Sequence, residues 1–109
     1  MQHFEIEHLI TEQIETKKPY LEFIRESSMS MGLYFLAEGS KDFQRPHNED
    51  EVYYILTGHA MLQVADEVQP VQPGSIIFVP ARIPHHFFNI VEDLTTLVFF
   101  APPEQPTEH

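Results

Sequence analysis

The sequence predicts an all-β domain, an antiparallel sandwich or barrel with one short helix at the N-terminus. Short runs of residues that favour strands recur at regular spacing between turn signals, with almost no helical pattern among them. One domain is expected from 109 residues, and 42% hydrophobic residues, including nine Phe and four Tyr, supply one core. Several prolines fall where strands are expected to end, where a missing amide proton costs little: Pro46, Pro70, Pro73, Pro80 and Pro84.

Residues 1–18 are expected to form the helical segment. Its apolar residues recur at three- and four-residue spacing, which places them on one helix face: Ile6, Leu9, Ile10 and Ile14. Lys17 and Lys18 suit the C-terminal end of a helix, and Pro19 ends it. Phe4 and Ile6 also fit the two-residue alternation of a strand, so the pattern allows that alternative at the start.

The strands are expected in order after Pro19. The candidate runs are residues 20–25, 29–37, 52–56, 60–65, 75–79, 85–90 and 94–100. Turn signals separate them at residues 38–40, 57–58, 70–74 and 91–93. Residues 104–109 are expected to form an extended, partly mobile tail.

Composition and charge exclude several function classes. Without cysteine the chain has no disulfide framework, thiol nucleophile, thiolate zinc site or iron–sulfur cluster. Six Lys and Arg against 17 Asp and Glu leave no basic stripe, so we expect no nucleic-acid partner. No apolar run approaches the roughly 20 residues of a membrane span, and the N-terminus lacks a signal-peptide pattern, so we expect a cytoplasmic protein without a membrane partner. Histidine and carboxylate chemistry remains.

Two segments carry residues that suit a metal site. His47 and Glu51 are four residues apart, which on an uninterrupted strand places both on one face. The face of Glu51 continues through Tyr53 into an apolar run, and a charge pointing into a sandwich is costly unless it is paired or binds a metal. With His85, from the second segment, they would form a set of two histidines and one carboxylate with open positions. The spacing alone does not show that the two segments meet.

Simpler interpretations remain for both segments. Residues 48–51 are also typical of a solvated acidic turn, and His85 can be a loop histidine. Glu49 shares the parity of His47 and Glu51 and competes as a ligand.

Both segments resemble the two motifs of the cupin superfamily. The first motif is matched by Gly39, His47, Glu51 and Gly58, and the second by Gly74, Pro80, His85 and Asn89. More narrowly, the chain resembles small single-domain bacterial cupins of mostly unassigned function, at Asp42, Gln44, Pro46, His47, Glu49, Asp50 and Glu51. The resemblance covers about residues 20–103. It implies a double-stranded β-helix, or jelly-roll barrel, over residues 19–103.

The resemblance also implies a divalent metal ion, Fe, Mn, Ni or Zn, held by His47, Glu51 and His85. Two motif positions differ from the family. Arg45 stands where the first motif histidine is expected, and it cannot ligate a metal because it stays protonated. Gln44 is the nearest substitute, a weak fourth ligand if the backbone before Pro46 turns its amide oxygen inward. Arg82 replaces the second-motif glycine.

Neighbouring residues are candidates for a substrate pocket. Tyr53, Phe87 and Phe99 are predicted to line it, although each also fits an ordinary apolar wall or core position. Arg45 can bind a carboxylate beside the metal, or be a solvated rim arginine. Tyr53 and Glu49 are the guesses for a general base.

Three functions follow as hypotheses. The first is a metal-dependent enzyme of oxygenase, isomerase or lyase type acting on a small oxygen-rich or carboxylate-bearing molecule. The second is a non-catalytic module that binds or senses a small molecule. The third is a structural or partner-binding homodimer in which residues 20–37 add strands across a two-fold axis. We expect a homodimer in any of these cases.

Overall fold

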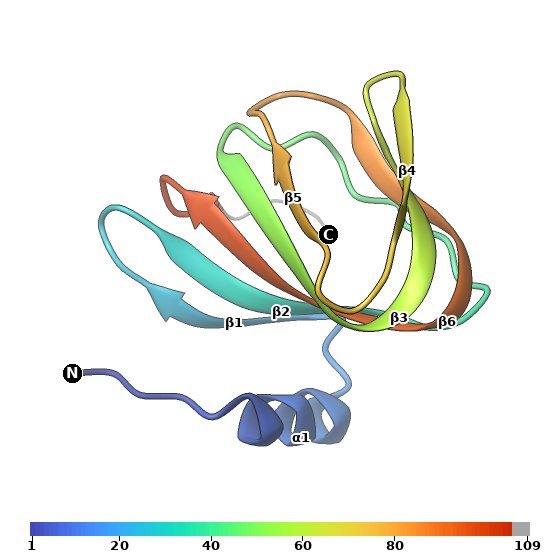
Figure 1. Ribbon diagram of the computed structural model, residues 1–109. Coiled ribbons are helices and arrows are strands. Elements are labelled where there is room, and N and C mark those ends of the chain that lie inside the picture. The colour runs from blue at the N-terminus through green and yellow to red at the C-terminus, as the bar shows by residue number, and fades with distance from the viewer. Residues whose placement is uncertain (106–109) are drawn as a thin grey trace.

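The computed structural model describes residues 1–105 of the chain. Its elements are α1 (Ile6–Thr16), β1 (Tyr20–Arg25), β2 (Ser30–Leu36), β3 (Asp50–Val64), β4 (Glu67–Val71), β5 (Ile76–Val79) and β6 (His85–Ala101). All strand pairs are antiparallel, in the order β1-β2-β6-β3-β4 with β5 also paired to β3. The sheet curls so that β3, β4, β5 and β6 surround an interior (Figure 1). The predicted all-β class with one short helix is confirmed.

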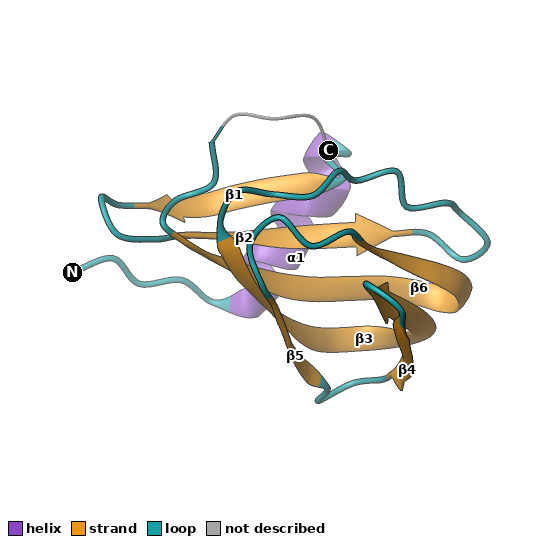
Figure 2. Ribbon diagram, turned by 90° about the horizontal axis from the view of Figure 1, so that it is seen from above, coloured by secondary structure: helices purple, strands orange, loops and turns teal. Residues whose placement is uncertain are grey.

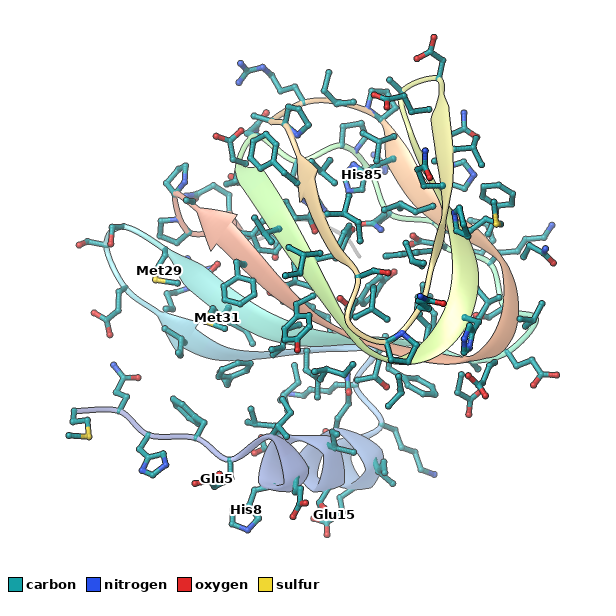
Figure 3. The ribbon with its side chains drawn as sticks, viewed as in Figure 1. Glu5, His8, Glu15, Met29, Met31 and His85 are labelled. Atoms are coloured by element: carbon teal, nitrogen blue, oxygen red, sulfur yellow. The ribbon has the colours of Figure 1, made fainter. Side chains whose placement is uncertain are left out.

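Helix α1 covers the outer face of the sheet rather than the mouth of the barrel. Leu9 is buried and packs with Leu21 and Leu33 of the first two strands. His8 and Glu15 point away from the sheet (Figure 3), and α1 crosses behind β1 and β2 when seen from above (Figure 2). The helix is shorter than the expected segment, because residues 1–5 are not helical and Lys17 adopts a left-handed conformation that ends it. No helix within residues 1–105 has the length and apolar character needed to cross a membrane.

Two long bent strands replace four of the expected short ones. The turns predicted at residues 57–58 and 91–93 are wrong, because β3 and β6 continue through both positions. Instead, the pairing of β3 with β6 shifts register three times between Ile55 and Met61. Gly58 has φ +97 there, and a Cβ atom on it would overlap the carbonyl oxygen of Asp93. Glycine therefore marks a bulge with close backbone approach, not a chain reversal.

Strand β4 was not predicted. It includes Pro70, which the sequence placed in a turn over residues 70–74, and the turn falls at residues 73–74 instead. Proline is tolerated because β4 is the last strand in the sheet order and therefore an edge strand. At the opposite edge β1 pairs with β2, and β2 pairs with β6 of the same chain. The homodimer through residues 20–37 stays a prediction.

The interior of the barrel is filled by alternate side chains of the long strands. Tyr53 and Ile55 of β3 are completely buried, and Tyr54 between them is exposed, as a pleated strand requires. They pack with interior residues of the other strands, including Leu62, Val79, Phe87, Leu94, Val98 and Phe100. This packed core forms a wall of the barrel interior.

Candidate metal centre

Three buried side chains meet inside the barrel: His47, Glu51 and His85. One ligand atom from each lies within 4.8 Å of the other two. Glu51 comes from β3, His85 is the first residue of β6, and His47 comes from the loop before β3. Figure 3 shows His85 inside the barrel, near β5. The structure thus brings together the three residues that the sequence singled out.

Glu51 points inward for the predicted reason, since it shares the interior face with Tyr53. The reason given for His47 was wrong, because β3 begins at Asp50 and strand parity does not reach position 47. The loop is instead attached to the turn before β6, where the Arg82 N–H donates to the His47 carbonyl over 2.6 Å. The ring of His47 also packs edge-on against Phe100, with centroids 5.1 Å apart. These two contacts direct His47 into the barrel.

The Nδ1 atom of His85, which points away from the cluster, sets the orientation of the imidazole ring. Nδ1 lies 2.8 Å from the Ile83 carbonyl, which can only accept a hydrogen bond, so Nδ1 carries a proton. Nε2 then faces Glu51, 3.0 Å from its Oε1. The two atoms approach without the direction of a hydrogen bond, and both are buried with no other hydrogen-bond partner among residues 1–105. Two converging acceptor atoms of this kind are what a bound cation would satisfy.

The direction of the His85 pKa shift indicates that a proton fits between His85 Nε2 and Glu51 Oε1 when no metal ion is bound there. Burial lowers the pKa of His85, but the close approach and the charge of the Glu51 carboxylate outweigh it and raise the pKa above its ordinary value. A proton and a metal ion therefore compete for the same space between Nε2 and Oε1. A neutral imidazole, an ionised carboxylate and a second imidazole are suitable ligands for a divalent cation, so the residues present fit a metal.

The Nδ1 atom of His47 faces the carboxylate of Glu104, a residue that the sequence analysis did not select. His47 Nδ1 lies 3.1 Å from Oε2 of Glu104, and both side chains are buried. The tail predicted over residues 104–109 therefore begins too early, because Glu104 is packed against the barrel. Residues 106–109 of that tail lie outside the described part of the chain. No periodicity pointed to Glu104, since it follows two prolines beyond the last strand.

Gln44 turns its amide oxygen toward the cluster. Its Oε1 is 3.4 Å from His47 Nε2 and accepts a hydrogen bond from the Tyr53 hydroxyl at 3.2 Å. Its amide nitrogen donates to Asp42 over 2.6 Å, which fixes the side-chain orientation. Asp42 also accepts the Phe87 backbone N–H at 2.9 Å and the Tyr34 hydroxyl at 2.7 Å. Asp42 was noted only as part of the family pattern, and here it anchors the loop to the interior.

Neither guess for a general base fits that role. Burial, followed by the charges of Glu51 and Asp42, raises the pKa of Tyr53 well above its ordinary value, so its hydroxyl stays protonated and acts as a donor. Glu49 is buried, but it precedes β3 and is not part of the group formed by His47, Glu51 and His85.

One predicted wall residue is misplaced by one position. Phe87 is buried and packs edge-on against Tyr53, with centroids 4.9 Å apart, as expected for an interior wall. Phe99 pairs with Val52, whereas Phe100 pairs with Glu51 and therefore shares its face. The sequence could not decide between the two phenylalanines because it did not show the register of β6 against β3. Arg45 is exposed, in the loop beside Gln44.

A cavity of about 670 Å³ opens between β4 and β5, and its lining does not include His47, Glu51 or His85. Its interior wall is mainly apolar and includes Leu62, Val64, Val71, Ile77 and Ile83. Two of its lining residues are strand partners of the aromatic pair: Leu62 pairs with Phe87, and Ile77 pairs with Tyr53. Its volume lies in the range of small-molecule sites.

Arg82 adopts the backbone conformation of the glycine that it replaces. Its φ is +66, a left-handed conformation that costs an ordinary L-residue about 1–2 kcal/mol. We expect Arg82→Gly to raise the free energy of unfolding by roughly 0.5–1 kcal/mol, because glycine removes this strain but adds freedom to the unfolded chain. Urea denaturation measures the change. Arg45→Gly is the control, since φ of Arg45 is not positive, and it should lower stability. A loss of stability in Arg82→Gly would contradict the prediction.

Comparison with known proteins agrees with this architecture. Residues 32–100 match the family described as "Cupin domain". The uncharacterized protein SCO3923 of Streptomyces coelicolor is 44% identical over 104 residues, covering 95% of this chain and 99% of that protein. The crystal structure of TT1209 from Thermus thermophilus has a TM-score of 0.77 and 27% identity, covering 94% of this chain and 99% of that chain.

A second solved structure has the same kind of fold. It is an RmlC-like cupin family protein from Methanocaldococcus jannaschii with a double-stranded β-helix fold. Its TM-score is 0.69 at 20% identity, over 76% of this chain and 78% of that chain. The curled sheet, the match over residues 32–100 and the near full-length relative lead to one conclusion: the chain belongs to the cupin family.

Proposed function

We propose that this cupin binds a divalent metal ion through His47, Glu51 and His85, with the Gln44 amide oxygen as an additional weak ligand. The observation that carries the proposal is the pair of buried atoms, His85 Nε2 and Glu51 Oε1, which converge to 3.0 Å without a hydrogen bond. Burying such atoms is costly unless something satisfies both. Nitrogen and oxygen ligands suit Fe(II), Mn(II), Ni(II) or Zn(II).

We propose further that the protein acts on a small oxygen-rich or carboxylate-bearing molecule. A bound cation of this type polarises a substrate oxygen or activates dioxygen, which serves oxygenase, isomerase and lyase reactions alike. The chain's own contribution is a protonated Tyr53 hydroxyl, a Gln44 oxygen held by Asp42, and aromatic walls that exclude water. The exposed guanidinium of Arg45 can attract an anion to the rim.

A non-catalytic role, binding or sensing a small molecule, is the second candidate. One observation favours it: neither Tyr53 nor Glu49 supplies a proton acceptor at the cluster, and Arg45 replaces a family ligand. In that case the metal would bind the ligand without Tyr53 or Glu49 as a proton-transfer partner.

The test is elemental analysis of the protein purified after growth in medium supplemented with Fe, Mn, Ni and Zn. We expect close to one equivalent of one metal. Less than a tenth of an equivalent would rule out the metal site. Calorimetry with malonate and its neutral diamide then probes the ligand class: malonate should bind to the loaded protein and not to the metal-free protein, and malonamide should bind more weakly. Equal binding of the two would contradict an anionic ligand.

A further inference from the structure

The segment after β6 returns to the barrel and contributes one buried carboxylate. Glu104 is 5% exposed, although Pro102 and Gln105 near it are exposed. Two hydrogen bonds anchor its backbone: its N–H donates to Ser30 Oγ over 3.0 Å, and the Arg25 guanidinium donates to its carbonyl. The position of residue 104 therefore does not depend on its own side chain.

The side chain is directed at a ligand of the candidate metal centre. Glu104 Oε2 lies 3.1 Å from Nδ1 of His47, while Nε2 on the other side of that ring faces Gln44 and the cluster. An ionised carboxylate attracts an N–H and repels a nitrogen lone pair, so its charge beside Nδ1 favours the His47 proton on that nitrogen. Nε2, which faces the Gln44 amide oxygen, is then the nitrogen whose lone pair would be directed at a metal ion.

In both histidines of the cluster the Nδ1 atom lies next to an oxygen atom, but the oxygen belongs to a backbone carbonyl in one case and to a carboxylate in the other. The Ile83 carbonyl accepts the Nδ1 proton of His85, and the Glu104 carboxylate lies 3.1 Å from Nδ1 of His47. A carboxylate in this role fixes the ring and increases the basicity of the ligating nitrogen more strongly than a neutral acceptor. Glu104 lies beyond residues 32–100, the part of the chain that matches the family.

We propose that Glu104 is a positioning residue that orients His47 for metal binding, so that the C-terminal segment completes the site. The inference rests on the proposed metal function of His47. It predicts that metal affinity depends on the charge of residue 104, although that residue does not contact the metal.

The test compares wild type, Glu104→Gln, Glu104→Ala and Glu92→Gln. The metal-free proteins are titrated with Zn(II) against a chromogenic chelator. Loss of an outer partner of a metal-binding histidine lowers affinity by about 10–100-fold, and we expect at least the lower value for Glu104→Gln. Glu92 is the matched control. It forms an exposed pair with His59, whose Nδ1 lies 2.7 Å from Glu92 Oε1, and neither residue belongs to the cluster. Its variant should bind Zn(II) as wild type does.

A second readout separates positioning from simple support of the fold. Nitrogen NMR of the metal-free protein at alkaline pH should show the Nδ1-protonated tautomer of His47 in wild type. In Glu104→Ala the population should shift toward the Nε2-protonated tautomer, because the Gln44 amide oxygen is then the acceptor that faces the ring. Unchanged Zn(II) affinity in both Glu104 variants would overturn the inference while leaving the metal site intact. Failure of wild type itself to bind Zn(II) would instead refute the proposed function.

Discussion

Replacing His85 with alanine is expected to abolish stoichiometric metal binding. The variant removes one of three ligand atoms that lie within 4.8 Å of one another and leaves Glu51 Oε1 without its neighbour. Removing a metal ligand should weaken binding more than removing a residue that only contacts a ligand, so the affinity for Zn(II) should fall by more than about 100-fold. Elemental analysis of the purified variant and chelator competition measure this directly. His47→Ala should behave in the same way.

Thermal unfolding gives an independent measure of the same prediction. A metal present at 100 times its Kd stabilises the folded state by about 2.7 kcal/mol. Wild type should gain this stability on addition of Zn(II), and His85→Ala should not. His59→Ala is the matched control, because His59 is exposed and paired with Glu92, and it should keep both the metal and the shift. Full metal content in both His47→Ala and His85→Ala would exclude the proposed ligands.

The candidate site was predictable where a regular strand carries it. Glu51 could be placed inside the barrel because the alternation through Tyr53 and Ile55 extends directly from it. His47 was selected correctly as a member of the cluster but for a reason that does not hold, since a loop and its hydrogen bond from Arg82 position it. The alternation of side chains therefore predicts which way a residue points only within the strand itself.

The sequence could not predict the position of residues whose location is set by pairing or contact with distant parts of the chain. The choice between Phe99 and Phe100 requires the pairing of β6 with β3. Glu104 requires knowing that a segment after two prolines returns to Ser30 and Arg25. The bend shared by β3 and β6 was missed for a related reason: glycine marks turns and bulges alike, and only the neighbouring strand decides between them.

Gly58 provides the second large effect. An alanine there would bring its Cβ to 2.7 Å from Leu94 Cα and into overlap with the Asp93 carbonyl oxygen, which is backbone and cannot rotate away. The left-handed φ of +97 adds conformational strain of about 1–2 kcal/mol. Overpacking against backbone adds about 1–3 kcal/mol, so Gly58→Ala should lower the free energy of unfolding by about 2–5 kcal/mol.

Gly39→Ala separates the two causes of this loss. Gly39 also has a positive φ, +73, but an added Cβ would meet no atom within 4 Å, so this variant carries only the conformational cost. Urea denaturation of both variants should therefore show Gly58→Ala to be the less stable by about 1–3 kcal/mol. Equal losses would mean that the backbones of β3 and β6 yield at this bulge. In that case the close approach at Gly58 would not be what holds the bend in the barrel wall, and the bend would have to follow from the register shifts on either side.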